Sequence, residues 1–155
     1  MTQKNQPIKR HPSMQQFSRD HHFGLLLSWK IRQGIQKNIA LERMRDYAVW
    51  AFEYQIKPHF ELEEQYLLPL LAEEDALRVQ TIEEHRVLEN LFHTKDFSQD
   101  TLSDIEALLD AHIRFEERVL FNHLQQIATP EELAKIEAIH HDTILKDDWQ
   151  DEFWA

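Results

Sequence analysis

The unit H-x-x-x-E occurs twice in this chain, at His59–Glu63 and at His112–Glu116. Residues four apart lie one turn apart on one face of an α-helix, so each His and its Glu are predicted to point the same way. Histidines also fall in two other stretches with a helical pattern, within the motifs Asp20-His21-His22 and Glu84-His85. Four helices that each direct a His inward, two of them with a carboxylate, predict a site for two metal ions.

The composition narrows the fold and the class of protein. The 155 residues include only two Gly and five Pro, which leaves little turn chemistry for a β-rich fold and favours a single all-α domain spanning 1–155. The absence of Cys excludes disulfides, thiolate zinc sites and iron–sulfur ligation. A net charge of −11 argues against nucleic acid or an anionic membrane as a partner. Residues 1–10 are polar and no apolar run approaches the roughly 20 residues of a membrane span, so we expect a cytoplasmic protein without a secretory signal.

Apolar periodicity predicts four long helices. They are expected at about 13–38, 41–71, 75–95 and 101–127. Ser13 is predicted to cap the first helix, with Gln16 completing a capping box, and Pro58 is predicted to kink the second just before His59. Short connections favour antiparallel neighbours, so we expect an up-down-up-down four-helix bundle with its core at about 13–127.

A C-terminal part, 130–155, is predicted beyond this core. Thr129, Pro130 and the two acids that follow fit an N-cap, a first helical residue and a negatively charged first turn, so a short fifth helix of about three turns should begin here. The segment Asp147–Trp154 is acidic and aromatic. It could dock on the bundle or on a partner, but we expect a loosely ordered terminus instead.

The predicted ligand set contains four His and two Glu. Its members are His21, His59, Glu63, His85, His112 and Glu116. Imidazole together with carboxylate suits iron, manganese or zinc, and the lack of thiolate disfavours copper(I). A Glu one turn from a His can bridge two ions while the His binds one of them. Six ligands around two ions leave room for a small exogenous molecule.

The ligand on the first helix is chosen with a helical wheel. His21 lies on the same side as Phe17 and Leu25, whereas His22 lies toward the polar side, so His21 is the expected ligand. Gly24 and Ser28 would then leave space beside it.

The surroundings of the site are expected to be apolar and fairly dry. Candidates for its lining are Leu25, Phe60, Leu67, Leu88 and Phe115. Glu64 and Glu117 each follow a predicted ligand by one residue. They should therefore point about 100° away from the site, into solvent or behind the ligands.

These motifs resemble those of the hemerythrin-like domain, also called the HHE cation-binding domain, in its bacterial type. The matching motifs occur in the same order: Asp20-His21-His22, His59-x-x-x-Glu63-Glu64 with Leu67-Leu68-Pro69, Glu84-His85, and His112-x-x-x-Glu116-Glu117 with Val119-Leu120-Phe121. The resemblance covers about residues 13–127. It implies a stand-alone four-helix bundle around a non-haem diiron centre of two iron ions, in which an oxo or hydroxo group can bridge the ions.

The chain departs from the oxygen-carrying members of that family in two ways. Those members have a second His one turn before the ligand on the third helix, where this chain has Thr81. They also place an Asp five residues after the His of the fourth helix, whereas here Glu116 follows four residues after it. Four His and two Glu, in place of five His, should leave more open metal positions, which favours redox reactivity over stable oxygen carriage.

The resemblance also implies a function, because the family binds dioxygen, nitric oxide or iron and includes sensors and iron-cluster repair proteins. We therefore expect a diiron protein that binds a small diatomic ligand, dioxygen or nitric oxide, or that handles or senses iron. The alternatives are a diiron redox enzyme of the oxidase, peroxidase, nitric oxide reductase or iron-cluster repair type, and a metal-free helical interaction module. No general acid or base stands out beside the ligands, so binding is preferred to dedicated catalysis.

Overall fold

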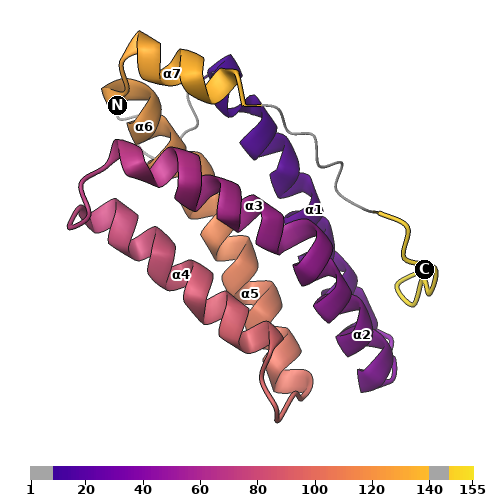
Figure 1. Cartoon of the computed structure of the whole chain (residues 1–155). Coiled ribbons are helices and arrows are strands. Elements are labelled where there is room, and N and C mark those ends of the chain that lie inside the picture. Colours follow the sequence, from indigo (N-terminus) through magenta and orange to yellow (C-terminus); the bar gives the residue numbers. More distant parts are fainter. Residues whose placement is uncertain (1–8, 140–146) are drawn as a thin grey trace, which may run out of the picture.

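The described part of the chain, residues 9–139 and 147–155 of a computed structural model, contains helices and no strand. The elements are, in order, α1 (Pro12–Gln36), α2 (Leu41–Ala51), η1 (Phe52–Ile56), α3 (Lys57–Leu62), η2 (Glu63–Leu67), η3 (Leu68–Leu70), α4 (Ala76–Phe92), α5 (Gln99–Phe115), η4 (Glu116–Leu120), α6 (Phe121–Ile127) and α7 (Pro130–Glu137). Elements α2 to η3 follow one another without a break, as do α5 to α6, so each set forms one long helical stretch (Figure 1). The all-α prediction is therefore confirmed for the described residues.

The start of α1 corrects the predicted cap. His11, not Ser13, is the N-cap, because its side chain accepts a hydrogen bond from the Ser13 backbone N–H. Pro12 takes the first helical position, where its missing N–H costs nothing, so the helix begins earlier than predicted. Gln16 does not complete a capping box and donates instead to Asp20, one turn further along.

The end of the helical region follows the predicted chemistry more closely. Thr129 caps α7 through a capping box with Glu132, and Pro130 is the first helical residue. The helix contains eight residues, which is about two turns rather than three. None of the described helices is long and apolar enough to cross a membrane.

The second long stretch changes its hydrogen bonding where the kink was predicted. Residues Phe52–Ile56 form a π-helical turn, in which the Lys57 N–H donates to the carbonyl oxygen of Phe52, five residues back. Pro58 follows directly and has no N–H to donate, so the α-helical ladder is interrupted at this point. The wider turn keeps the chain helical and carries it on to His59.

The long stretches lie side by side, with α1 packed against α2 and α5, and α5 also against α4 (Figure 1). Their apolar side chains form two clusters. One contains Leu27, Ile31, Tyr47, Phe52, Leu88, Phe92, Leu102 and Ile105 among its members. The other contains Met14, Phe17, Leu67, Leu68, Leu120, Phe121 and Leu124 among its members. Along α1, His21 lies between the positions that contribute to the two clusters, and along α5–α6 Glu116 does so.

One residue of α1 does not lie on the side of the helix that the helical wheel predicted. Leu25 is 41% exposed, so its expected place beside the site is wrong. Gly24, Leu27 and Ser28 are buried instead. Because residue 25 is rotated by about 100° from residue 24, only one of the two can face the core, and glycine takes the inner position.

Candidate metal centre

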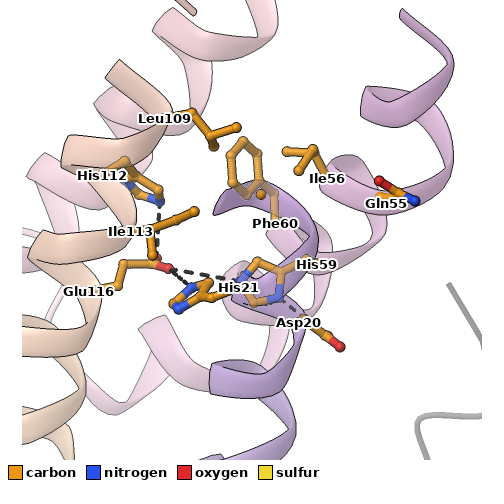
Figure 2. A pocket seen from close by; sticks show the side chains of 11 residues that line it. Asp20, His21, Gln55, Ile56, His59, Phe60, Leu109, His112, Ile113 and Glu116 are labelled. Atoms are coloured by element: carbon orange, nitrogen blue, oxygen red, sulfur yellow. Dashed lines mark hydrogen bonds and ion pairs between the residues drawn. The ribbon is translucent and has the colours of Figure 1, made fainter. Parts of the chain in front are cut away.

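The six residues predicted as ligands come together in one buried cluster. All six residues are 5% exposed or less. They form two groups of four, His21–His59–Glu63–Glu116 and Glu63–His85–His112–Glu116, and within each group one ligand atom per residue lies within 4.8 Å of all the others. Both groups contain Glu63 and Glu116, so each carboxylate is placed where it could bridge two ions. Figure 2 shows His21, His59 and His112 around Glu116.

Each shared Glu faces one His from each half of the cluster. The distances from imidazole Nε2 to carboxylate oxygen are 2.9 Å for His59–Glu63, 3.1 Å for His85–Glu63, 2.8 Å for His21–Glu116 and 3.2 Å for His112–Glu116. The two oxygens of Glu63 therefore contact different histidines, and the same holds for Glu116. This is the arrangement that a carboxylate bridging two ions requires.

Several of these inward atoms have no hydrogen-bond partner among the described residues, although they are fully buried. They are Nε2 of His59, His85 and His112, both carboxylate oxygens of Glu63, and Oε2 of Glu116. A buried polar atom without a partner costs roughly 1–3 kcal/mol, so six of them in one place call for a compensating ligand. A pair of cations at the centre fits this donor set, because each carboxylate oxygen, and each Nε2 once it has lost its proton, offers a lone pair to a metal.

A second ring of carboxylates holds the histidines from behind. The distances from Nδ1 to carboxylate oxygen are 2.6 Å for His21–Glu117, 2.7 Å for His85–Glu64, 2.6 Å for His112–Glu84 and 3.4 Å for His59–Asp20. An ionised carboxylate accepts a hydrogen bond, so each Nδ1 carries a proton. In a neutral imidazole this leaves the lone pair on Nε2, which points inward. The expectation that Glu64 and Glu117 lie behind the ligands therefore fits their positions.

The outer carboxylates are themselves held by two kinds of partner. Glu117 accepts a hydrogen bond from Arg10, and Glu64 accepts one from Arg86. Each of these two carboxylates contacts a histidine of the group to which its own helical stretch contributes no histidine. Asp20 accepts from Gln16 at 2.9 Å and Glu84 from Gln80 at 2.8 Å, in each case from one turn earlier on the same helix. Each predicted metal position thus has one His backed by an arginine-paired acid and one backed by a glutamine-paired acid.

The two halves also match in the placement of their rings. The His21 and His59 ring centroids are 4.9 Å apart with the planes at 68°, and His85 and His112 show the same two values. The Phe121 ring stacks on the His21 ring with their centroids 5.4 Å apart, and the Phe60 ring stacks on the His85 ring with a centroid distance of 3.8 Å. Apolar rings therefore cover one His of each pair and exclude water from it.

Both shared Glu residues begin a π-helical turn. Glu63 opens η2, where its carbonyl oxygen accepts from the Leu68 N–H, and Glu116 opens η4, where its carbonyl oxygen accepts from the Phe121 N–H. Such turns are rare and occur frequently at functional sites. In both H-x-x-x-E units the π-helical turn begins at the Glu. This recurrence links the backbone feature to the positioning of the carboxylates.

The carboxylates set the protonation of the histidines. Burial by itself lowers the pKa of His85, but contacts with Glu116, Glu63 and Glu64 outweigh it and raise this pKa to about 10. Burial likewise lowers the pKa of His112, but contacts with Glu116 and Glu84 outweigh this effect and raise the pKa to about 9. Burial also acts against ionisation of Glu116, yet the neighbouring histidines hold its pKa well below the usual range. A metal ion entering the site must therefore displace protons.

A small cavity lies beside the cluster. Its walls include His21, His59, His112 and Glu116 together with Gly24, Ile56, Phe60, Leu109 and Ile113 (Figure 2). It leaves about 10 Å³ for the centre of a water-sized sphere, which is room for roughly one such molecule. Gly24 borders it as expected, whereas the Ser28 hydroxyl donates to the backbone carbonyl of Glu106.

The predicted pocket lining is borne out in part. Among the apolar candidates, Phe60 lines the cavity, Leu67 and Leu88 are buried in the two core clusters, Phe115 is partly buried, and Leu25 is exposed.

No role was predicted from the sequence for Asp20, Glu84, Arg10 or Arg86. A signal for the first two was present, because an acid directly precedes the histidine in both Asp20-His21 and Glu84-His85. Each of these acids contacts the histidine of a different helix, which the sequence alone does not reveal. Arg10 lies before α1 and contacts Glu117 across 107 positions of sequence, and no local pattern marks such a contact.

The two adjacent histidines of α1 differ in their surroundings. His21 is buried and contacts both Glu116 and Glu117, whereas the adjacent His22 is exposed. We expect His21→Ala to lower the metal content and the melting temperature, and the matched variant His22→Ala to change neither. Metal analysis and thermal melts of the two proteins provide the test. The reverse ranking would contradict the assignment of His21.

Comparison of the chain with protein-family models, with curated proteins and with solved structures found no match in any of the three.

Proposed function

We propose that this chain is a hemerythrin-like non-haem diiron protein that binds a small diatomic ligand, dioxygen or nitric oxide. The observation that carries the proposal is the pair of His–His–Glu–Glu groups that share both carboxylates. Four imidazoles with two carboxylates suit iron or manganese, and the symmetric bridging positions favour two ions over one. The cluster also argues against a metal-free interaction module, because without metal six buried ionisable side chains would be held only by ion pairs, several with inward atoms that make no hydrogen bond.

The proposal assigns roles to the residues of the cluster. His21 and His59 would hold one ion, His85 and His112 the other, and Glu63 and Glu116 would bridge them. Two iron ions held there would supply one-electron redox chemistry and positions for a small exogenous ligand. Thr81, at the place of the fifth His of oxygen carriers, donates its hydroxyl to the carbonyl oxygen of Leu77 and stays with its own helix.

We also propose the up-down-up-down order for the four long helical stretches. The packing of α1 on α2 and α5, and of α5 on α4, supports it, as do the short connections between successive stretches. In this bundle every stretch contributes one His, and the second and fourth each contribute one bridging Glu.

The size of the cavity supports a diatomic ligand. Space for roughly one water-sized molecule is closer to the size of a diatomic gas than to that of most organic substrates. The walls beyond the ligands are chiefly apolar, as suits a neutral gas. A site that accepts only so small a molecule favours binding, sensing or gas reduction over chemistry on a larger substrate.

The proposal is tested by mixing the reduced, iron-loaded protein with nitric oxide, azide or oxygenated buffer in a stopped-flow spectrometer. Each addition should change the optical spectrum, and dioxygen should oxidise the protein within minutes. An argon purge should then fail to restore the reduced spectrum. A restored spectrum would make the protein an oxygen carrier, and an unchanged spectrum with every ligand would contradict the binding function.

A variant of the cavity sharpens this test. A methyl group added at Gly24 would lie 2.6 Å from Cδ1 of Ile113, so Gly24→Val should fill the cavity. We expect it to weaken nitric oxide binding at unchanged iron content. The matched control is Leu25→Val, a change at the exposed neighbouring position.

A further inference from the structure

The acidic aromatic segment, residues 147–155, docks on the end of the molecule formed by α1 and α2, where a loosely ordered terminus was expected. The surface beneath it, called here the α1–α2 surface, consists of Lys30, Gly34, Lys37, Arg43, Met44, Tyr47 and Trp50. Figure 1 shows the segment beside these helices, away from α7, which precedes it in the chain. Phe153 is only 3% exposed, so the docking buries apolar area.

Charged side chains fix the register of the segment. Arg43 contacts Asp151 through two parallel hydrogen bonds, Nε to Oδ2 at 2.9 Å and Nη2 to Oδ1 at 2.6 Å. Lys37 Nζ donates to the backbone carbonyl oxygens of Trp154 and Ala155 at 2.8 and 2.7 Å. Two-pronged Arg–carboxylate pairing is specific in geometry, so it selects an acid at one position of the segment.

Aromatic rings on both sides also join the segment to the surface. Tyr47 lies within 6 Å of three segment rings, at 5.9 Å from Trp149, 5.7 Å from Phe153 and 5.1 Å from Trp154. Trp50 adds a contact with Trp149 at 5.3 Å. Such ring pairs stabilise the docked segment beyond the effect of the area that they bury.

Two further residues of the surface, Lys30 and Gly34, make room for or contact aromatic rings of the segment. Lys30 Nζ lies 3.9 Å from the Trp154 ring centroid, so a cation covers this ring. A Cβ at Gly34 would lie 2.9 Å from Cε1 of Phe153 and 2.6 Å from Sδ of Met44. Only glycine at this position therefore lets the Phe153 ring and Met44 reach α1 together.

Charge complementarity strengthens this match. The chain as a whole carries −11, yet the α1–α2 surface presents three cations, Lys30, Lys37 and Arg43. The segment carries four acids, Asp147, Asp148, Asp151 and Glu152. A basic aromatic surface on an acidic protein discriminates in favour of an acidic aromatic peptide.

We propose that the α1–α2 surface also recognises the aromatic segment of a second copy, so that two copies of this chain associate by exchanging their segments. The contacts above join side chains and backbone carbonyls of the segment to the surface, and a segment from either copy can make them. Exchange of an identical element is a low-cost route to a dimer. The segment of the same copy competes at an effective concentration on the order of millimolar, so exchange is weak in the unaltered protein.

Charge reversal of the Arg43–Asp151 pair tests the exchange in full-length protein. In R43D and in D151R, like charges face each other within one copy. In a mixture, the surface of D151R meets the segment of R43D as a normal pair, and the surface of R43D meets the segment of D151R as a reversed pair. Both contacts are then restored only between copies.

Sedimentation analysis should show each single variant as a monomer and the equimolar mixture as a dimer, with a severalfold larger dimer fraction than either variant alone. The double variant R43D/D151R should return to the monomer, because the reversed pair closes within one copy. Q150A, at an exposed segment position, is the matched control and should behave as the unaltered protein. A mixture that stays monomeric would overturn the proposal. The measurement needs no metal, so its outcome is independent of the proposed function.

Discussion

Glu116→Ala is expected to empty both metal positions, not one. Glu116 belongs to both ligand groups, is 0% exposed, and contacts His21 and His112 from opposite halves of the cluster. Its removal deletes a bridge and leaves protonated histidines without their acid. Breaking a buried ion pair in this way costs roughly 3–5 kcal/mol, so the metal-free variant should also be less stable than the metal-free parent.

Metal analysis and thermal melts of Glu116→Ala measure both effects. Asp104→Ala, an exposed acid on the same helix α5, is the matched control and should keep its metal and its melting temperature. Glu63→Ala should behave like Glu116→Ala, because Glu63 belongs to the same two groups. Retention of two ions by either Glu variant would contradict the bridging assignment.

Removal of metal should lower the melting temperature of the unaltered protein. Binding to the folded state alone stabilises by about 4 kcal/mol when free metal exceeds its dissociation constant about a thousandfold. For a chain of this size, that corresponds to a shift of about 8–16 °C. Equal melting temperatures for the stripped and the loaded protein would count against a metal site in the core.

The stripped protein should also lose stability as the pH rises. His85 and His112 have folded-state pKa values of about 10 and about 9, above the ordinary 6.5. Their contribution is therefore fully present below pH 6.5 and is lost as the pH rises through 9 and 10. The loaded protein should resist this loss, because metal replaces the departing protons. Melts of both forms between neutral pH and these values provide the comparison, and parallel curves would contradict it.

The spacing of the ligands accounts for how much of the site was predictable. The spacing H-x-x-x-E corresponds to one helical turn, so His59–Glu63 and His112–Glu116 could each be placed on one helix face without knowledge of the fold. A helical wheel distinguished His21 from His22 because one position lies toward the apolar side. It failed for Leu25, because the glycine beside it packs inward and leaves Leu25 outside.

Contacts between helices explain what the sequence did not show. Which histidine each of Asp20, Glu84 and Glu117 supports depends on the packing of separate helices, over as many as 96 positions of sequence. The π-helical turns at Glu63 and Glu116 have no recognised sequence pattern that would have predicted them. The docking of Phe153 and its neighbours depends on a surface that two helices form jointly, so composition alone suggested disorder.

The metal content of the purified, unaltered protein tests the central claim most directly. Protein produced with iron available should contain two iron ions per chain, one for each His–His–Glu–Glu group, with an optical spectrum that changes on reduction. The same preparation of Glu116→Ala should contain none. An unaltered protein that purifies without metal, gains none when iron is supplied, and melts at the same temperature in both conditions would contradict the account.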